Sequence, residues 1–289
     1  MPQSTQNRDF LLGGTLPVRR LGFGAMRLPT GTFHGPVRDP EVGLAVLRRA
    51  VELGVNHIDT AWFYRRGDVA ANDLIRTALT PYADDLVIAT KVGPILGDAG
   101  VPSGQAEPHQ LRALVEDNLR TLGVDRLDLV YLRIGGMSPP GGESLAARFE
   151  VLAALREEGL IRHLGVSNID AAQLAEAQAI APVAAVQNAF HIHDRGDTDL
   201  IARCEESGIA FVPFFPLGGG HRPIDQGRLA RVMARHDATA AQLALAWMLL
   251  LSPAMLAIPG TGSLDHLEEN MSAQAIHLTQ EDLDDLTQG

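Results

Sequence analysis

The chain has 289 residues, 46% of them hydrophobic, and a formal net charge of -11, which disfavours nucleic-acid partners because their phosphates would be repelled. A single cysteine, Cys204, excludes an internal disulfide, and the longest apolar run, residues 243–251, is too short to cross a bilayer. With no apolar signal core at the N-terminus, these features predict one cytoplasmic domain over residues 1–289, a monomer or small homo-oligomer without membrane partners.

Short β-branched segments alternate along the chain with segments of helical spacing. The predicted strands are Arg20–Gly24, Asn56–Thr60, Leu86–Lys91, Leu127–Leu132, Ile161–Ser167, Ala184–Gln187, Ile209–Pro213 and Met255–Ile258. The predicted helices are Pro40–Leu53, Val69–Leu79, Pro108–Leu122, Ser144–Glu158, Ala171–Ala179, Thr198–Ser207, Ala238–Leu250 and Ser263–Met271. Eight such units predict an α/β protein, a closed parallel (β/α)8 (TIM) barrel, which needs about 250 residues.

Three segments lie outside these eight units. Residues 10–21 predict a hairpin at the bottom of the barrel, residues 221–236 an extra helix after the seventh strand, and residues 280–287 a last helix. A doubly wound open sheet is the alternative fold, and it would usually bind a dinucleotide through G-x-G-x-x-G. Gly22-Phe23-Gly24 is followed by Ala25, Met26 and Arg27, so the third glycine of that motif is missing and the barrel is favoured.

An acid, a phenol and an ammonium lie at or just beyond the ends of two neighbouring predicted strands. Asp59 ends one strand, Tyr64 follows it by five residues, and Lys91 ends the next strand. In a barrel these positions converge on one pocket. An ammonium lowers the pKa of a nearby phenol and a carboxylate holds the ammonium in place, so Tyr64 could protonate a carbonyl oxygen. Each residue alone has an ordinary structural explanation, but the combination favours catalysis.

The chain resembles the aldo-keto reductase family over nearly its whole length. The resemblance is carried by the segments Gly54–Tyr64, Ala89–Lys91, Gly165–Asn168, Val186–Asn188, Pro213–Gly218 and Ile258–Asn270. It implies reduction of a small-molecule carbonyl substrate by a nicotinamide cofactor, with Asp59, Tyr64 and Lys91 as the catalytic residues. The cofactor-binding residues that it implies are Gly24, Ala25, Met26, Ser167, Asn168, Gln187, Phe214, Phe215, Pro216, Leu217, Gly218, Gly260, Thr261, Gly262, His266, Glu269 and Asn270.

Arginine replaces a residue that the family usually has as histidine at the end of the fourth strand. Arg133 can hold a carbonyl oxygen or an anion, but it cannot relay a proton. This substitution is similar to that of a bacterial branch that includes pyridoxal reductases. We therefore expect Arg133 to act with the catalytic residues on a substrate that carries a negative group beside its carbonyl. Arg65 and Arg66 either add to this positive field or point into solvent.

His266 stands where relatives that prefer NADPH often have arginine. Histidine is mostly neutral at neutral pH, so it would hold a 2′-phosphate less firmly. The resemblance implies NADPH as the cofactor, with NADH possible.

Two functions of other classes remain as alternatives. His191, His193 and Asp194 could belong to a metal-dependent hydrolase barrel, although no cluster of acids and histidines accompanies them at the other strand ends, and we expect no metal. A non-catalytic nucleotide-binding subunit would be favoured by loss of Tyr64 or Lys91, and both are present.

Overall fold

A computed structural model describes residues 9–32, 35–97, 102–136, 141–220 and 226–287. Its central sheet has seven parallel strands that are neighbours in chain order. They are β3 (Phe23–Gly24), β4 (His57–Asp59), β7 (Val87–Val92), β10 (Leu127–Arg133), β11 (Ile161–Ser167), β12 (Val183–Gln187) and β13 (Ala210–Phe211).

The predicted eighth strand closes this sheet into a barrel. Phe211 forms a parallel bridge with Met255, and Leu21 forms one with Ala257. The Gly22 amide donates to the Ala257 carbonyl at 2.8 Å, so the last strand pairs with both the seventh and the first. The prediction of a (β/α)8 barrel is confirmed.

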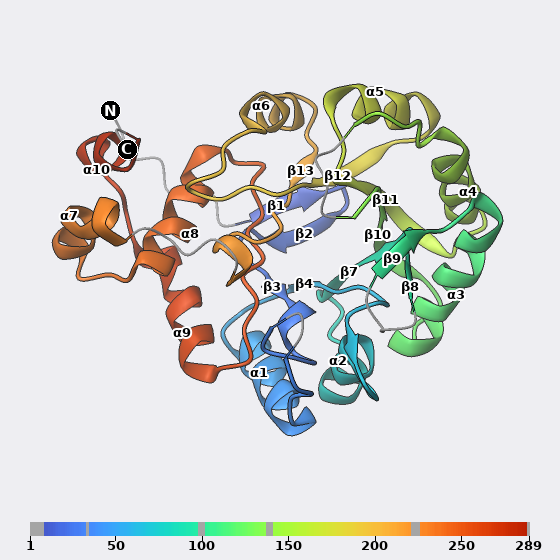
Figure 1. Ribbon diagram of the computed structural model, residues 1–289, viewed down its shortest axis with the longest axis horizontal. Helices are drawn as coiled ribbons and strands as arrows, with labels where there is room; N and C mark the ends of the chain where they lie inside the picture. Colours follow the sequence, from blue (N-terminus) through green and yellow to red (C-terminus); the bar gives the residue numbers. More distant parts are fainter. Residues whose placement is uncertain (1–8, 33–34, 98–101, 137–140, 221–225, 288–289) are drawn as a thin grey trace.

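Helices surround the strands (Figure 1). They are α1 (Pro40–Glu52), α2 (Ala71–Leu79), α3 (Leu111–Leu122), α4 (Ala146–Glu157), α5 (Ala171–Ile180), α6 (Thr198–Glu206), α7 (Gln226–His236), α8 (Ala240–Leu251), α9 (Leu264–Ser272) and α10 (Gln280–Thr287). Local signals explain where they begin and end. Asp170 accepts from the Gln173 amide at the start of α5, and Gly123 ends α3 with a φ of 70°, which glycine adopts without strain. No helix in the described ranges is both long and apolar enough to span a bilayer.

The predicted N-terminal hairpin fills the bottom of the barrel. It consists of β1 (Asp9–Leu12) and β2 (Leu16–Arg19), which pair antiparallel. Leu12 and Val18 are fully buried and pack in one apolar cluster with inward-facing residues of the barrel strands, such as Leu129. This cluster occupies the end of the barrel where the strands begin, opposite their carboxyl ends.

Two small hairpins were not predicted. The helix expected at Val69–Leu79 begins instead at Ala71, because Val69–Ala70 form β6, which pairs with β5 (Arg65–Arg66). Between the predicted strand Leu86–Lys91 and the predicted helix Pro108–Leu122, where no element was expected, the structure has β8 (Pro94–Leu96) and β9 (Pro102–Gln105). Of the helix predicted over residues 221–236, α7 is the described part, and residues 221–225 lie outside the described ranges.

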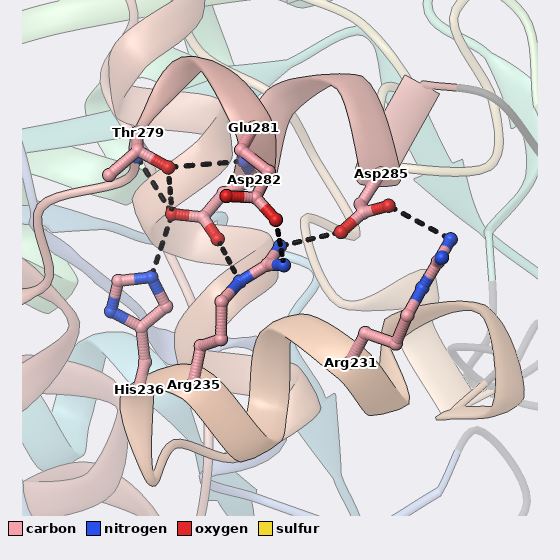
Figure 2. A network of polar contacts seen from close by, with 7 residues as sticks. All are labelled: Arg231, Arg235, His236, Thr279, Glu281, Asp282 and Asp285. Atoms are coloured by element: carbon pink, nitrogen blue, oxygen red, sulfur yellow. Dashed lines mark hydrogen bonds and ion pairs between the residues drawn. The ribbon is translucent and has the colours of Figure 1, made fainter.

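A cluster of charged side chains joins α10 to α7 (Figure 2). Asp282 on α10 is fully buried, and its carboxylate accepts from Arg235 Nε at 2.8 Å and from the Thr279 amide at 2.8 Å. His236 Nε2 lies 2.8 Å from the same carboxylate. Burial alone would raise the pKa of Asp282, but hydrogen bonds from Thr279, His236 and Arg235 outweigh it and hold that pKa well below its usual range.

Replacing Asp282 with asparagine is expected to lower the free energy of unfolding by about 1–3 kcal/mol, since Arg235 loses its buried partner. The exposed Glu281, replaced by glutamine as a control, should change stability by less than about 0.5 kcal/mol. A carboxylate with a depressed pKa stabilises the fold above its unfolded pKa of about 3.9 and loses this contribution as the pH falls. Urea unfolding at neutral and acidic pH should therefore show a smaller acid sensitivity in Asp282→Asn, and equal sensitivity would contradict this role.

Candidate active site

A pocket of about 350 Å³ opens at the carboxyl ends of the barrel strands. This is the end where parallel barrels place their functional residues. The predicted site residues that line it are Gly24, Met26, Asp59, Tyr64, Lys91, Arg133, Gln187, Phe214, Phe215, Pro216, Leu217 and Gly260. The four residues that the sequence predicts to be catalytic are thus brought together.

Asp59 and Lys91 form a buried ion pair in the floor of this pocket. Asp59 pairs in register with Ala89, so Lys91 lies two residues further along the neighbouring strand and faces the same side. Lys91 Nζ donates to Asp59 Oδ1 at 2.5 Å and to the Thr60 carbonyl at 3.0 Å. Each of the two charged side chains is at most 3% exposed, and the carboxylate keeps the buried ammonium compensated.

Gln187 forms a hydrogen bond with the second oxygen of the Asp59 carboxylate. Its Nε2 donates to Asp59 Oδ2 at 2.8 Å, while its Oε1 is buried and has no hydrogen-bond partner among the residues that the structure describes. A buried acceptor without a donor is costly, so a ligand group that donates a hydrogen bond is expected there. A carboxamide N–H group of a nicotinamide ring fits this requirement.

Tyr64 lies over the ammonium of Lys91, with Lys91 Nζ 4.9 Å from the centre of its ring. Burial and, more weakly, the Asp59 carboxylate raise the pKa of the Tyr64 phenol, while the Lys91 ammonium and, most weakly, Arg133 oppose this effect. The sequence predicted only the acidifying influence of the lysine. In the absence of ligands the balance keeps the phenol protonated at neutral pH, as a proton donor requires.

Arg133 forms the wall of the pocket on the side of β10. Its guanidinium donates to Ser167 Oγ at 3.1 Å and to the Gly136 carbonyl at 2.8 Å, and it lies 4.5 Å from the centre of the Phe214 ring. Among the described residues no carboxylate forms an ion pair with it. Burial lowers the pKa of Arg133. Since Lys91 is neutralised by Asp59, Arg133 leaves the pocket with an excess positive charge.

Glycine at position 93 allows β7 and β10 to end close together. Gly93 has a φ of 117°, and a Cβ built there would lie 2.4 Å from the Arg133 carbonyl oxygen. No other residue type fits without moving the backbone that carries Arg133.

The remaining predicted cofactor residues lie around the pocket or beyond it, not among its lining. They are Ala25, Ser167, Asn168, Gly218, Thr261, Gly262, His266, Glu269 and Asn270. Ser167 contacts the site through Arg133, and the Asn168 side chain donates to the Ile134 carbonyl at 3.0 Å. The last five lie just before α9 or on it, and Ser263 caps this helix by accepting from the His266 amide.

Several lining residues were not singled out individually from the sequence. They are Arg27, Phe63, Pro94, Pro102, Gly135, Gly136, Gly219, Ile258 and Pro259. Most of them lie in loops after strand ends, and that position was the available signal. Arg65 and Arg66 do not line the pocket: Arg65 is exposed and lies over the Trp62 ring at 5.7 Å, and Arg66 donates to the Gly35 carbonyl. The suggestion that this pair contributes to the active site is therefore not supported.

The two histidines that follow β12, His191 and His193, contact each other within their loop. His191 is buried, and the His193 amide lies 3.2 Å from its Nδ1. In the described ranges no group of three or more histidine, cysteine, aspartate or glutamate side chains is arranged to hold a metal ion.

Comparisons with known proteins decide the family. The model of the Aldo/keto reductase family matches residues 20–288. The chain belongs to the aldo/keto reductase family. Pyridoxine 4-dehydrogenase of Escherichia coli (strain K12) is 46% identical over 275 residues, which cover 94% of this chain and 95% of that protein.

Solved aldo-keto reductases share the fold. A thermostable member crystallised with the inhibitor epalrestat superposes with a TM-score of 0.81 at 28% identity, covering 96% of this chain and 98% of the other. A Klebsiella pneumoniae member in complex with NADP and acetate gives 0.77 at 27% identity, covering 96% and 94%. Membership of the family makes this chain an oxidoreductase that depends on a nicotinamide cofactor.

Proposed function

We propose that the protein reduces an aldehyde to an alcohol with NADPH, that Tyr64 donates the proton, and that the substrate is pyridoxal or a similar anionic aldehyde. The observation that carries this proposal is the convergence of Tyr64, the Asp59–Lys91 pair and an uncompensated Arg133 on one pocket. The relative named pyridoxine 4-dehydrogenase supports the choice of substrate.

One set of residues would bind the cofactor, and another would act on the carbonyl group of the substrate. Gln187, Ser167 and Asn168 would hold the nicotinamide carboxamide, and the Phe214 ring would lie against the nicotinamide ring. A reduced nicotinamide supplies the hydride when it is bound. Tyr64 donates its phenolic proton to the carbonyl oxygen, and the Lys91 ammonium stabilises the phenolate that this leaves. Asp59 holds the ammonium charged and in place.

Arg133 selects the substrate. Its guanidinium is buried, carries no paired carboxylate and faces the pocket, so an anionic group on the substrate would relieve an uncompensated charge. The ring hydroxyl of pyridoxal ionises readily and lies next to the aldehyde. One arginine could therefore bind both oxygens.

The function is tested with a panel of aldehydes, pyridoxal included, by following oxidation of NADPH and of NADH in parallel. The proposal expects turnover of pyridoxal with a higher kcat/KM for NADPH. Turnover with NADH alone would remove the cofactor assignment. Absence of turnover of any aldehyde, despite nucleotide binding, would instead favour a non-catalytic subunit.

Replacing Arg133 with leucine is expected to lower kcat/KM for pyridoxal by about 30- to 150-fold, the loss of one charge-assisted contact of about 2–3 kcal/mol. A neutral aldehyde of similar size should lose less than about fivefold, and Arg133→Lys should retain part of the preference. The affinity of the wild type and of both variants for NADPH is measured in parallel by fluorescence. Equal losses on both aldehydes would contradict selection by charge, and a loss of NADPH affinity beside them would assign Arg133 to cofactor binding.

A further inference from the structure

A second polar cluster lies behind the two catalytic strands, outside the barrel. Thr60 follows Asp59 and Thr90 precedes Lys91, and side chains alternate along a strand, so both hydroxyls face the helices. Both threonines are fully buried. They meet Asn72 of α2 and Asn118 of α3, which are at most 2% exposed.

Hydrogen bonds link these four side chains in one chain. Thr60 Oγ1 donates to Asn72 Oδ1 at 2.8 Å, and Thr90 Oγ1 donates to Asn118 Oδ1 at 2.6 Å. Asn72 Nδ2 joins the two halves by donating to Asn118 Oδ1 at 3.1 Å. The orientation of the Asn118 amide is fixed because its Nδ2 donates to the Leu114 carbonyl at 2.8 Å.

This chain closes into a ring through the catalytic lysine. The Thr60 carbonyl accepts from Lys91 Nζ in the pocket, while the Thr60 hydroxyl is held by Asn72 behind the strand. Thr90, the residue before Lys91, is held by Asn118. Lys91 is therefore held by this network at two points. Its ammonium is bound to the Thr60 carbonyl inside the pocket, and its backbone follows Thr90, which is bound to Asn118 behind the strand.

The backbone does not need these contacts. The Thr60 amide already donates to the Ala89 carbonyl at 2.8 Å, so the strands pair without the side-chain network. An apolar core of the same shape would satisfy packing equally well, since replacing both partners of a buried hydrogen bond by apolar groups can be nearly neutral. The network lies instead where it fixes the distance between the ends of β4 and β7.

We propose that Asn72 and Asn118, acting through Thr60 and Thr90, are positioning residues that hold Lys91 at the distance from Asp59 and Tyr64 that proton transfer requires. This inference rests on the proposed function. The charged groups that face the Tyr64 phenol come from three strands: Asp59 from β4, Lys91 from β7 and Arg133 from β10. Displacement of Lys91 alone would remove a cation that opposes the effect of burial, so the phenol would ionise at higher pH.

The test compares Thr90→Val, which removes the hydroxyl at nearly constant volume, with Thr90→Ser, which retains it. Thr90→Val leaves Asn118 Oδ1 with its bond from Asn72, so the protein should fold. Ser252→Ala removes a buried hydroxyl that caps the Ala254 amide at the far side of the barrel and is the control for a general loss of stability. We expect Thr90→Val to lower kcat by about tenfold with KM for NADPH within about twofold, and Thr90→Ser to restore kcat.

A second measurement does not require turnover. The chain has three tyrosines, and the ultraviolet titration of the wild type minus that of Tyr64→Phe isolates the ionisation of Tyr64. Thr90→Val should move this ionisation to higher pH, whereas Thr90→Ser and Ser252→Ala should leave it in place. If the Tyr64 ionisation shifts in Thr90→Val but the wild type reduces no aldehyde, the proposed reaction is wrong and the positioning role stands. An unshifted Tyr64 in Thr90→Val, or an equal shift in Ser252→Ala, would overturn the inference.

Discussion

Replacing Tyr64 with phenylalanine is expected to lower kcat for aldehyde reduction by about 10³-fold or more. The ring and its packing against Phe63 remain, but the proposed proton donor is lost, and general acid catalysis contributes about 10²–10⁴-fold. Affinity for NADPH, measured by fluorescence, should change by less than about threefold, because in the proposed mechanism the phenol contacts the reacting carbonyl and not the body of the cofactor.

The matched control for this substitution is Tyr82→Phe. The Tyr82 hydroxyl donates to the Leu122 carbonyl at 2.7 Å behind the barrel and does not line the pocket. This variant should keep the wild-type kcat and lose about 1 kcal/mol of unfolding free energy. A Tyr64→Phe enzyme that retained more than a tenth of the wild-type kcat would show that another group supplies the proton.

Replacing Lys91 with methionine is expected to have the second largest effect, a loss of about 10²–10³-fold in kcat. The phenolate that the proposed mechanism generates loses its counter-ion, while Asp59 is left as an uncompensated buried charge. Breaking a buried pair by removing one partner costs about 3–5 kcal/mol, so thermal stability should fall together with activity.

The double variant Asp59→Asn/Lys91→Met separates these two effects. It removes the unpaired charge, so the free energy of unfolding should recover most of its loss while kcat stays low. Chemical denaturation and steady-state kinetics on the same preparations measure both. Recovery of activity along with stability would mean that Lys91 serves the fold and not the chemistry.

The sequence predicted the barrel because its signals are local and repeated. Alternating strand and helix periodicity, with glycine such as Gly123 after helices, defines the eight units without knowledge of tertiary contacts. Asp59 and Lys91 could be placed in one pocket for the same reason, since parallel strand ends meet at one end of a barrel. The small hairpins β5–β6 and β8–β9 were missed because two to four residues carry no clear period.

Contacts that depend on how the barrel closes could not be predicted. The sequence implied that Gln187 binds the cofactor, but its bond to Asp59 spans 128 positions and follows from the stagger of the strands. The balance of effects on the pKa of Tyr64 likewise depends on burial. For Asn118 a signal did exist: it occupies the apolar stripe of α3 with Val115 and Leu122, and a polar residue there needs a buried partner.

The pH dependence of kcat/KM for pyridoxal, measured for the wild type and for Lys91→Met, tests the central claim most directly. If Tyr64 is the acid and Lys91 tunes it, the wild-type profile falls at high pH as the phenol ionises, and in Lys91→Met this fall moves to higher pH. A decline at the same pH in both enzymes would contradict the account, because the group that titrates would then not feel the charge of Lys91.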